Sequence, residues 1–395
     1  MDLFDKCYKF TRADEAKAQG YYPYFKAIQS GAGSSVMIDG KKFIMIGSNN
    51  YLGLTQDERV KQAAIEALET FGSGCTGSRY LNGTLSLHEE LEEKLANFVR
   101  KDAALVFSTG FQTNQGTIST IVGKDDIIFS DRANHASIID GCRLAFGKIV
   151  RYKHNNIQDL ERQLKTNGKN SGGKLIVSDG VFSMEGDIVK LPEILELANK
   201  YQARVMIDDA HSCGVLGKTG RGTGEHFGLE DGIDLVMGTF SKSFASIGGF
   251  IAGEKKAINY IKHHARSFIF SASMPPSAVA TVSKAVDILI SEPERLDHLW
   301  KNTKKMKKGF DEMGFNTGVS ETPIIPIIIG DDLKTFFFWK LLFENGIFSN
   351  PVISPAVEQG NQLLRTSYMA THTDEELDQV LEAFYKLGKQ FGLIQ

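Results

Sequence analysis

From residue 174 to residue 253 the chain alternates apolar, strand-like runs with a segment of helical periodicity. The strand-like runs are residues 174–178, 203–207 and 234–237. Between the first two, apolar side chains recur at the i, i+3, i+4, i+7 spacing of an amphipathic helix, at Leu191, Ile194, Leu195 and Ala198. Strands that alternate with helices imply right-handed crossovers and a largely parallel sheet covered on both faces. The sequence therefore predicts an α/β fold.

Reactive side chains come just after the strand-like runs, at Ser183, Asp208, His211, Thr239 and Lys242. In open α/β sheets ligands bind outside the carboxyl ends of the strands, so these side chains are expected at one site. A lysine amine can condense with an aldehyde, an aspartate can keep a pyridinium nitrogen protonated, and a histidine can stack on the ring or hydrogen-bond to it. The set predicts a carbonyl-handling site suited to pyridoxal 5'-phosphate.

Two motifs in this region resemble those of the α-oxoamine synthases: Asp208-Asp209-Ala210-His211 and Gly238-Thr239-Phe240-Ser241-Lys242-Ser243. These pyridoxal-phosphate-dependent enzymes of fold type I join an amino acid to an acyl thioester with loss of carbon dioxide. Within the family, the chain is most similar to the soluble bacterial serine palmitoyltransferases, from about Tyr21 to the C-terminus. The resemblance implies a large domain with a mostly parallel sheet covered by helices, and a smaller α+β C-terminal domain.

The same resemblance divides the chain into an N-terminal arm and hairpin at 1–60, a large cofactor-binding domain at 61–290 and a small C-terminal domain at 291–395. The hairpin is also indicated by its own pattern, because two apolar runs between Val36 and Ile46 flank Asp39-Gly40. The resemblance further implies a homodimer whose subunits share their active sites.

The resemblance assigns a role to each reactive side chain. Lys242 would bind the cofactor covalently and, once released, remove the α-proton of the substrate. Asp208 would face the ring nitrogen, His211 the ring hydroxyl and Thr239 the phosphate, and Ser183 would also contact the cofactor. The predicted catalytic residues are Lys242, His135, Asp208 and His211.

Further segments carry predicted cofactor contacts. Residues 103–114 have the pattern of a strand, a tight turn and a helix start, where backbone amides can seat a phosphate. The resemblance assigns Gly110 and Phe111 to this seat, although a plain strand–helix turn has the same pattern. His135 resembles the ring-stacking histidine of the family, whereas a lone histidine is more often structural than catalytic. Ser271 resembles a residue that reaches the phosphate of the other subunit.

Two residues are predicted to bind the amino-acid substrate. Asn50 lies in a loop, residues 47–54, that resembles the amino-acid-binding segment of the family, although serine and asparagine also suit ordinary turns. Arg365 resembles the carboxylate-binding arginine, whose planar fork suits bidentate binding. A surface arginine paired to an acid is the alternative for Arg365.

Two further sequence patterns, a glycine-rich motif and a lysine-rich helix, resemble binding sites but are not predicted to be binding sites. Gly72-Ser73-Gly74-Cys75-Thr76-Gly77 matches the dinucleotide-binding fingerprint, but it follows a helical segment, residues 60–71, where the fingerprint requires a strand, so an NAD site is not expected. A predicted helix carries Lys301, Lys304, Lys305, Lys307 and Lys308. Nearby acidic residues favour a solvated face over a site for thioester phosphates or a weak contact with an anionic membrane surface.

Composition excludes several classes of function. A formal net charge of −3 means that the chain lacks the excess of basic residues expected of a nucleic-acid-binding protein. The four scattered cysteines are expected as reduced thiols rather than as a disulfide or zinc framework, so no metal is predicted. The N-terminus has no signal-peptide pattern and no run of about 18 apolar residues occurs, so a soluble cytoplasmic protein is expected.

Together these patterns predict a pyridoxal-phosphate-dependent, decarboxylative condensation of L-serine with palmitoyl-CoA, giving 3-ketodihydrosphingosine, the first step of sphingolipid synthesis. Residues 268–273 and 369–373 look most like the serine branch of the family. A sibling enzyme that joins cysteate, alanine or glycine to another acyl thioester stays open. A non-catalytic partner subunit of the same fold is a further alternative, but such subunits lack the cofactor-binding lysine and Lys242 is present.

Overall fold

The computed structural model describes residues 2–168 and 172–395, and its largest sheet has seven strands. Their order is β3-β9-β8-β7-β6-β4-β5, and β9 is the strand that runs antiparallel to its neighbours. The strands are β3 (Ala103–Phe107), β4 (Ile127–Asp131), β5 (Lys148–Tyr152), β6 (Lys174–Asp179), β7 (Arg204–Asp208), β8 (Leu235–Thr239) and β9 (Gly249–Gly253). The predicted, largely parallel sheet is confirmed.

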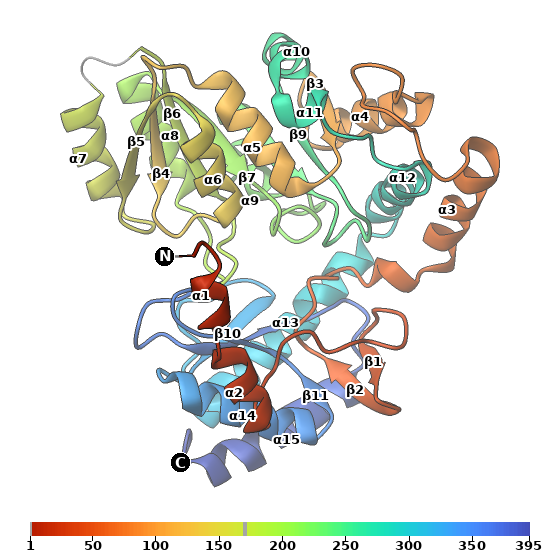
Figure 1. The fold of residues 1–395 in the computed structure, drawn as a ribbon, viewed down its shortest axis with the longest axis vertical. Helices are drawn as coiled ribbons and strands as arrows, with labels where there is room; N and C mark the ends of the chain where they lie inside the picture. The colour runs from red at the N-terminus through yellow and green to blue at the C-terminus, as the bar shows by residue number, and fades with distance from the viewer. Residues whose placement is uncertain (1, 169–171) are drawn as a thin grey trace.

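Helices cover both faces of this sheet, so its strands are buried on two sides (Figure 1). In β6, for example, Leu175 and Val177 join one hydrophobic cluster and Ile176 joins the other. One face carries α5 (Gly110–Ile121), α6 (Ala136–Leu144), α10 (Lys255–His264) and α11 (Arg266–Ile269). The other carries α3 (Glu58–Phe71), α4 (Ser86–Phe98), α7 (Ile157–Asn167), α8 (Leu191–Tyr201) and α12 (Pro276–Ser291). Burial on both faces explains why the strands read as continuous apolar runs.

Two smaller sheets lie below the large one in Figure 1. One has the order β10-β13-β12, and the other has the order β1-β2-β11. Their strands are β10 (Ile324–Ile328), β13 (Leu363–Ser367), β12 (Asn350–Val352), β1 (Ser35–Ile38), β2 (Lys41–Met45) and β11 (Ile347–Phe348). A separate hydrophobic cluster joins them to α13 (Glu294–Met313), α14 (Asp332–Glu344) and α15 (Asp374–Phe391).

The predicted hairpin is confirmed as β1 and β2, which pair antiparallel on either side of Asp39 and Gly40. Both turn residues have positive φ, 48° and 72°, as a tight two-residue hairpin turn requires. On its other side β2 pairs in parallel with β11, so the N-terminal hairpin lies with the C-terminal elements. The boundaries at residues 60 and 290 stay a prediction.

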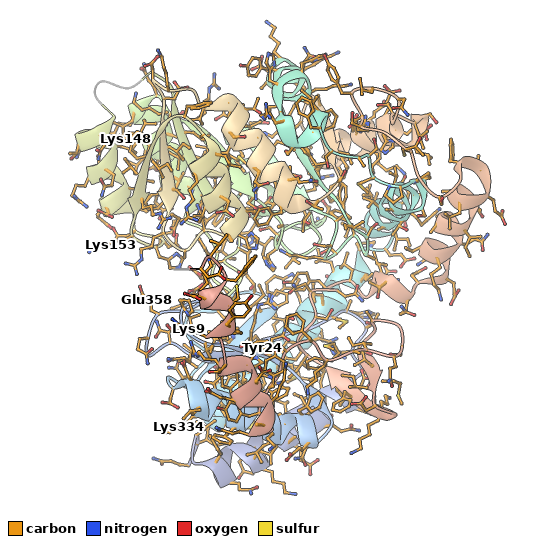
Figure 2. The ribbon with its side chains drawn as sticks, viewed as in Figure 1. Lys9, Tyr24, Lys148, Lys153, Lys334 and Glu358 are labelled. Carbon is orange, nitrogen blue, oxygen red and sulfur yellow. The ribbon has the colours of Figure 1, made fainter. Side chains whose placement is uncertain are left out.

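The part of the molecule that contains the two smaller sheets is called the lower body here, and the part around the seven-stranded sheet is the upper body. The N-terminal segment crosses the lower body, where Figure 2 labels Lys9 and Tyr24. Its helices α1 (Asp5–Tyr8) and α2 (Arg12–Ala18) bury none of their residues, and Tyr21 beyond them stacks on Phe336 of α14. Short helices also occur at η1 (Leu54–Gln56), α9 (Thr223–Phe227) and η2 (Glu230–Gly232). Over the described ranges, no helix is both long enough and apolar enough to cross a membrane.

Candidate active site

A cavity of about 280 Å³ opens beside the carboxyl ends of β6, β7 and β8. It lies where the sequence predicted a site, because neighbouring parallel strands end at the same edge of the sheet. The predicted residues that line it are Gly110, Phe111, His135, Asp208, His211, Thr239 and Lys242. The other predicted residues, Asn50, Ser183, Ser271 and Arg365, lie outside this lining.

Asp208 ends β7 and is buried, with its carboxylate fixed by two donors. The side-chain amide of Asn114 donates to Oδ2 at 2.6 Å, and the backbone N–H of Ala210 donates to Oδ1 at 2.9 Å. An ionised carboxylate held in this way can stabilise a positive charge on a ring nitrogen in the cavity. Asn114, on α5, was not predicted as a site residue, because its role depends on a contact with a strand far along the sequence.

Lys242 follows β8 and brings its amine into the same cavity. Burial lowers the pKa of the Lys242 amine to about 8, and Arg365 acts in the same direction, while Asp208 and Asp179 favour the charged form. A lowered pKa leaves a sizeable neutral fraction near physiological pH. The neutral amine is the form that attacks a carbonyl and that removes a proton.

His135 stands at the start of α6 with its ring on the cavity. Asn114 donates to Ser137 Oγ at 2.8 Å, and that hydroxyl lies 2.8 Å from His135 Nδ1. The backbone N–H of Ser137 also donates to Nδ1, so the ring hydrogen belongs on Nε2. Burial lowers the pKa of His135, so a neutral ring is presented to the cavity.

Asp179, at the end of β6, is a second acid of the lining that sequence reasoning missed. Its Oδ2 accepts the backbone N–H of His135 at 2.7 Å, and its own N–H donates to Asn134 Oδ1 at 2.9 Å. Burial, together with Asp208 alongside, raises the pKa of Asp179 well above its usual range. Asp179 therefore fixes the turn that carries His135.

His211 is buried at the back of the cavity, with Nδ1 2.7 Å from the hydroxyl of Tyr51. Burial lowers the pKa of His211 well below its usual range, so the ring is neutral and can hydrogen-bond to a ring hydroxyl. Burial also raises the pKa of Tyr51. Tyr51 belongs to the predicted substrate loop, residues 47–54, but no pattern in the sequence distinguished it as a site residue.

Arg365 lies in the middle of β13 and joins three parts of the chain. Its Nε donates to the carbonyl oxygen of Ser183 at 2.6 Å, and its Nη2 donates to Asn49 Oδ1 at 2.9 Å. The neighbouring Asn50 instead donates to Thr55 Oγ1 at 2.8 Å and to the carbonyl of Ala32 at 3.1 Å. The substrate contact of Asn50 stays a prediction, and the structure brings Asn49 to Arg365.

The N-terminus of α5 forms one wall of the cavity. Gly110 and Phe111 are its first two residues, whose N–H groups have no acceptor within the helix. A Cβ on Gly110 would lie 2.6 Å from Thr239 Oγ1, so a glycine is needed for the helix to approach β8. Close by, Ser271 Oγ accepts a 3.0 Å hydrogen bond from the side chain of Gln112 on the same helix.

Residues 41–384 match the family model described as aminotransferase class I and II. This chain belongs to that family. A serine palmitoyltransferase of Sphingobacterium spiritivorum is 52% identical over 98% of this chain and 97% of its own length. An 8-amino-7-oxononanoate synthase of Thermoanaerobacter pseudethanolicus is 46% identical over 97% of both chains. A high-resolution structure of SPT with a PLP internal aldimine matches 100% of both chains, with a TM-score of 0.95 and 38% identity.

These matches confirm the predicted likeness to the α-oxoamine synthases within the class I and II aminotransferase family. The cavity of this family member also fits pyridoxal phosphate on its own chemistry. The amides of Gly110 and Phe111, which have no acceptor within α5, and the hydroxyl of Thr239 suit a phosphate, and the Asp208 carboxylate suits a protonated ring nitrogen. The Lys242 amine suits the aldehyde.

Proposed function

We propose that this protein is a pyridoxal-phosphate-dependent acyltransferase that condenses L-serine with a long-chain acyl thioester such as palmitoyl-CoA. The observation that carries the proposal is the grouping of the Lys242 amine, the Asp208 carboxylate and the His135 ring around one cavity. The 52% identity to a serine palmitoyltransferase over nearly the whole chain supports the choice of substrates. The product would be 3-ketodihydrosphingosine, the first intermediate of sphingolipid synthesis.

Each side chain then has a defined task. The cofactor, when bound, supplies an electron sink for the negative charge that develops on Cα of serine. Of the residues that line the cavity, Asp208 would keep the ring nitrogen protonated, His211 would hydrogen-bond to the ring hydroxyl, and His135 would stack on the ring. Gly110, Phe111 and Thr239 would hold the phosphate of the cofactor. Ser183 and Ser271 stay predicted contacts outside the lining of this chain's cavity, with Ser271 assigned to the phosphate of the other subunit.

Arg365 on β13 would bind the carboxylate of serine with its planar guanidinium, which Asn49 of the loop at residues 47–54 orients. The Cα–H bond of serine breaks, and the proton passes to the neutral amine of Lys242. A bond then forms between Cα and the acyl carbonyl carbon, and the bond from that carbon to sulfur breaks, so that a thiolate leaves and takes a proton from solvent. The bond from Cα to the carboxylate breaks, carbon dioxide is released and Cα is reprotonated, leaving the aminoketone.

A sibling reaction is the second candidate, because the relatives also include 8-amino-7-oxononanoate synthases at 46% identity. Steady-state assays of serine, alanine, glycine and cysteate, each with long and short acyl thioesters, test the choice. We expect the highest kcat/KM for serine with palmitoyl-CoA. A higher value for another amino acid would move the assignment to a sibling, and no turnover with any pair would favour the non-catalytic partner subunit.

We further propose a cytoplasmic homodimer with shared active sites. Phe111 and Ile247 line the cavity yet are 40% and 53% exposed in the single chain, and a second subunit would cover such apolar side chains. The lysines on α13 give little support to membrane contact, because Lys301, Lys305, Lys307 and Lys308 have acidic partners within 4.0 Å. Light scattering of the purified enzyme measures the oligomeric state.

A further inference from the structure

His154 lies between two buried carboxylates, outside the lining of the cofactor cavity. Its Nδ1 is 3.2 Å from Asp131 Oδ1, and its Nε2 is 3.2 Å from Asp187 Oδ2. The side chains of these two acids are only 1% and 8% exposed. Because carboxylates only accept hydrogen bonds, both ring nitrogens of His154 donate, and the ring is an imidazolium.

Electrostatics supports this charged form. Burial alone would lower the pKa of His154, but the hydrogen bonds to Asp131 and Asp187 outweigh it and raise the pKa to about 10. The edge of His154 also meets the ring of Phe182, with 4.4 Å between the ring centroids. Asp187 Oδ2 also accepts a 2.9 Å hydrogen bond from the side-chain amide of Asn155, while Oδ1 has no hydrogen-bond partner among the described residues. Asn155 is a neutral donor, so the positive charge beside this buried carboxylate comes from His154.

On one side, the contact with His154 leads to the turn that carries His135. Asp131 ends β4, and its Oδ1 also accepts the N–H of Ala133 at 2.8 Å. Its Oδ2 accepts the N–H of Asn155 at 2.7 Å. Asp131 therefore ties the segment around His154 to the first residues of the turn before His135.

On the other side, the contact leads to the loop that holds Arg365. This loop is closed by two backbone hydrogen bonds, from Gly186 N–H to Phe182 O at 2.9 Å and from Phe182 N–H to Asp187 O at 3.1 Å. Within it, the carbonyl of Ser183 accepts the 2.6 Å hydrogen bond from Arg365 Nε. A shift of Asp187 would therefore move the acceptor that orients the guanidinium.

The same region faces the boundary between the two bodies of the molecule. His154 and Lys153 line a second cavity of about 710 Å³, which is lined from the lower body by residues that include Pro355 and Glu358. Figure 2 labels Lys153 at the lower edge of the upper body and Glu358 below it. The two loops that His154 joins thus stand at the edge where segments of the two bodies meet.

We propose that His154 is a positioning residue for the amino-acid site: its imidazolium joins the turn of His135 to the loop of Ser183 and so sets the spacing between the His135 ring and the Arg365 guanidinium. The inference rests on the proposed function, because it takes these two groups as the contacts of an amino-acid substrate. His154 itself lies outside the cofactor cavity, so its effect passes through the two loops.

The test is His154→Gln in the holoenzyme, with His298→Gln, an exposed histidine of α13, as the matched control. The amino-acid dissociation constant is read from the visible absorbance of the bound cofactor, without acyl thioester. We expect a rise of about fivefold or more for His154→Gln, with kcat at saturating serine within about threefold of wild type. His298→Gln should match wild type in both.

A double variant separates positioning from charge compensation. In His154→Gln/Asp187→Asn the uncompensated carboxylate is removed, so the thermal midpoint should recover even if the single variant folds poorly. The amino-acid dissociation constant should stay raised, because glutamine does not join both loops. Recovery of amino-acid affinity in the double variant, or wild-type affinity in His154→Gln, would overturn the inference.

Wild-type protein titrated with serine, alanine and glycine keeps the two hypotheses apart. If none of them changes the absorbance of wild type, the proposed function fails. If one does, that amino acid is used for all variants, and unchanged affinity in His154→Gln then counts against the positioning role alone.

Discussion

The side-chain amide of Asn114 donates a 2.6 Å hydrogen bond to Oδ2 of Asp208. The same amide nitrogen donates to Ser137 Oγ, which in turn lies 2.8 Å from His135 Nδ1. One buried side chain on α5 therefore links the acid proposed to face the ring nitrogen with the histidine proposed to cover the ring. The fixed carboxylate needs no reorganisation when a positive charge is placed beside it, which favours a protonated pyridine ring.

Asn114→Ala should weaken cofactor binding by about tenfold or more. The variant removes a hydrogen bond to a charged group, which contributes about 1.5–3 kcal/mol, and each 1.4 kcal/mol is a factor of ten in affinity. Fluorescence titration of the cofactor-free protein measures the dissociation constant.

Thr117→Val is the matched control, because Thr117 is equally buried one turn along α5 and its hydroxyl has no hydrogen-bond partner among the described residues. This variant should bind the cofactor as wild type does. Equal affinity in Asn114→Ala and wild type would show that the hydrogen bond to Asp208 is dispensable.

Covalent attachment of the cofactor should follow the titration of Lys242. The pKa of this amine lies at about 8, below the 10.5 of an ordinary lysine, and only the neutral amine attacks an aldehyde. The neutral fraction rises with pH, so the rate of attachment to the cofactor-free protein should rise through about pH 8 and level off above about pH 9. Stopped-flow absorbance across this range measures the rate.

Lys242→Ala provides the control for this experiment, since it should bind the cofactor without covalent attachment and show no turnover. Borohydride reduction followed by mass spectrometry distinguishes the two forms. A wild-type rate that still climbs steeply at pH 10 would indicate an unperturbed lysine, and full activity in Lys242→Ala would remove the mechanism.

Two adjacent asparagines should differ in their effect on serine binding. Asn49→Ala removes the acceptor of Arg365 Nη2, so we expect the KM for serine to rise about tenfold. Asn50→Ala removes bonds to Thr55 and Ala32, so we expect a loss of about 1 kcal/mol in the free energy of unfolding and a KM within about twofold of wild type. The reverse order would restore the substrate contact predicted for Asn50 from the sequence.

The fold could be predicted where the sequence pattern is local. The strand-like runs at 174–178, 203–207 and 234–237 are β6, β7 and β8 within one or two residues, because buried parallel strands are apolar on both faces. The sequence pattern also predicts one helix over residues 255–267, and this prediction is wrong, because the structure has two helices there, α10 and α11. The chain is extended at Ala265, and α11 then turns Phe268 into the core against Phe107. The interruption between α10 and α11 depends on tertiary packing, which cannot be inferred from helical periodicity in the sequence.

The site residues that could be predicted are those that come directly after a strand in the sequence. Lys242, Asp208 and His211 lie on one cavity, because parallel strands deliver their ends to one edge. Asn114 and Asn49 could not be found in this way, since their partners lie 94 and 316 residues away in the chain. An asparagine looks the same in the sequence whether it lies in a turn, at a helix cap or in a buried hydrogen-bond network. Only its tertiary contacts reveal which role it has.

Gly110→Ala should disrupt the phosphate seat while leaving the rest of the fold intact. The added methyl group would lie 2.6 Å from Thr239 Oγ1 and 3.2 Å from Met237 Cε, so α5 or Thr239 has to move. Overpacking of this kind costs about 1–3 kcal/mol, and we expect a cofactor dissociation constant raised by about tenfold.

Gly33→Ala is the control, because its added methyl group would meet nothing closer than 3.7 Å. Titration with inorganic phosphate as a competitor gives a second readout, because the helix terminus, rather than the aldehyde, contacts that anion. If Gly110→Ala retained both affinities, the seat would lie elsewhere than at the start of α5.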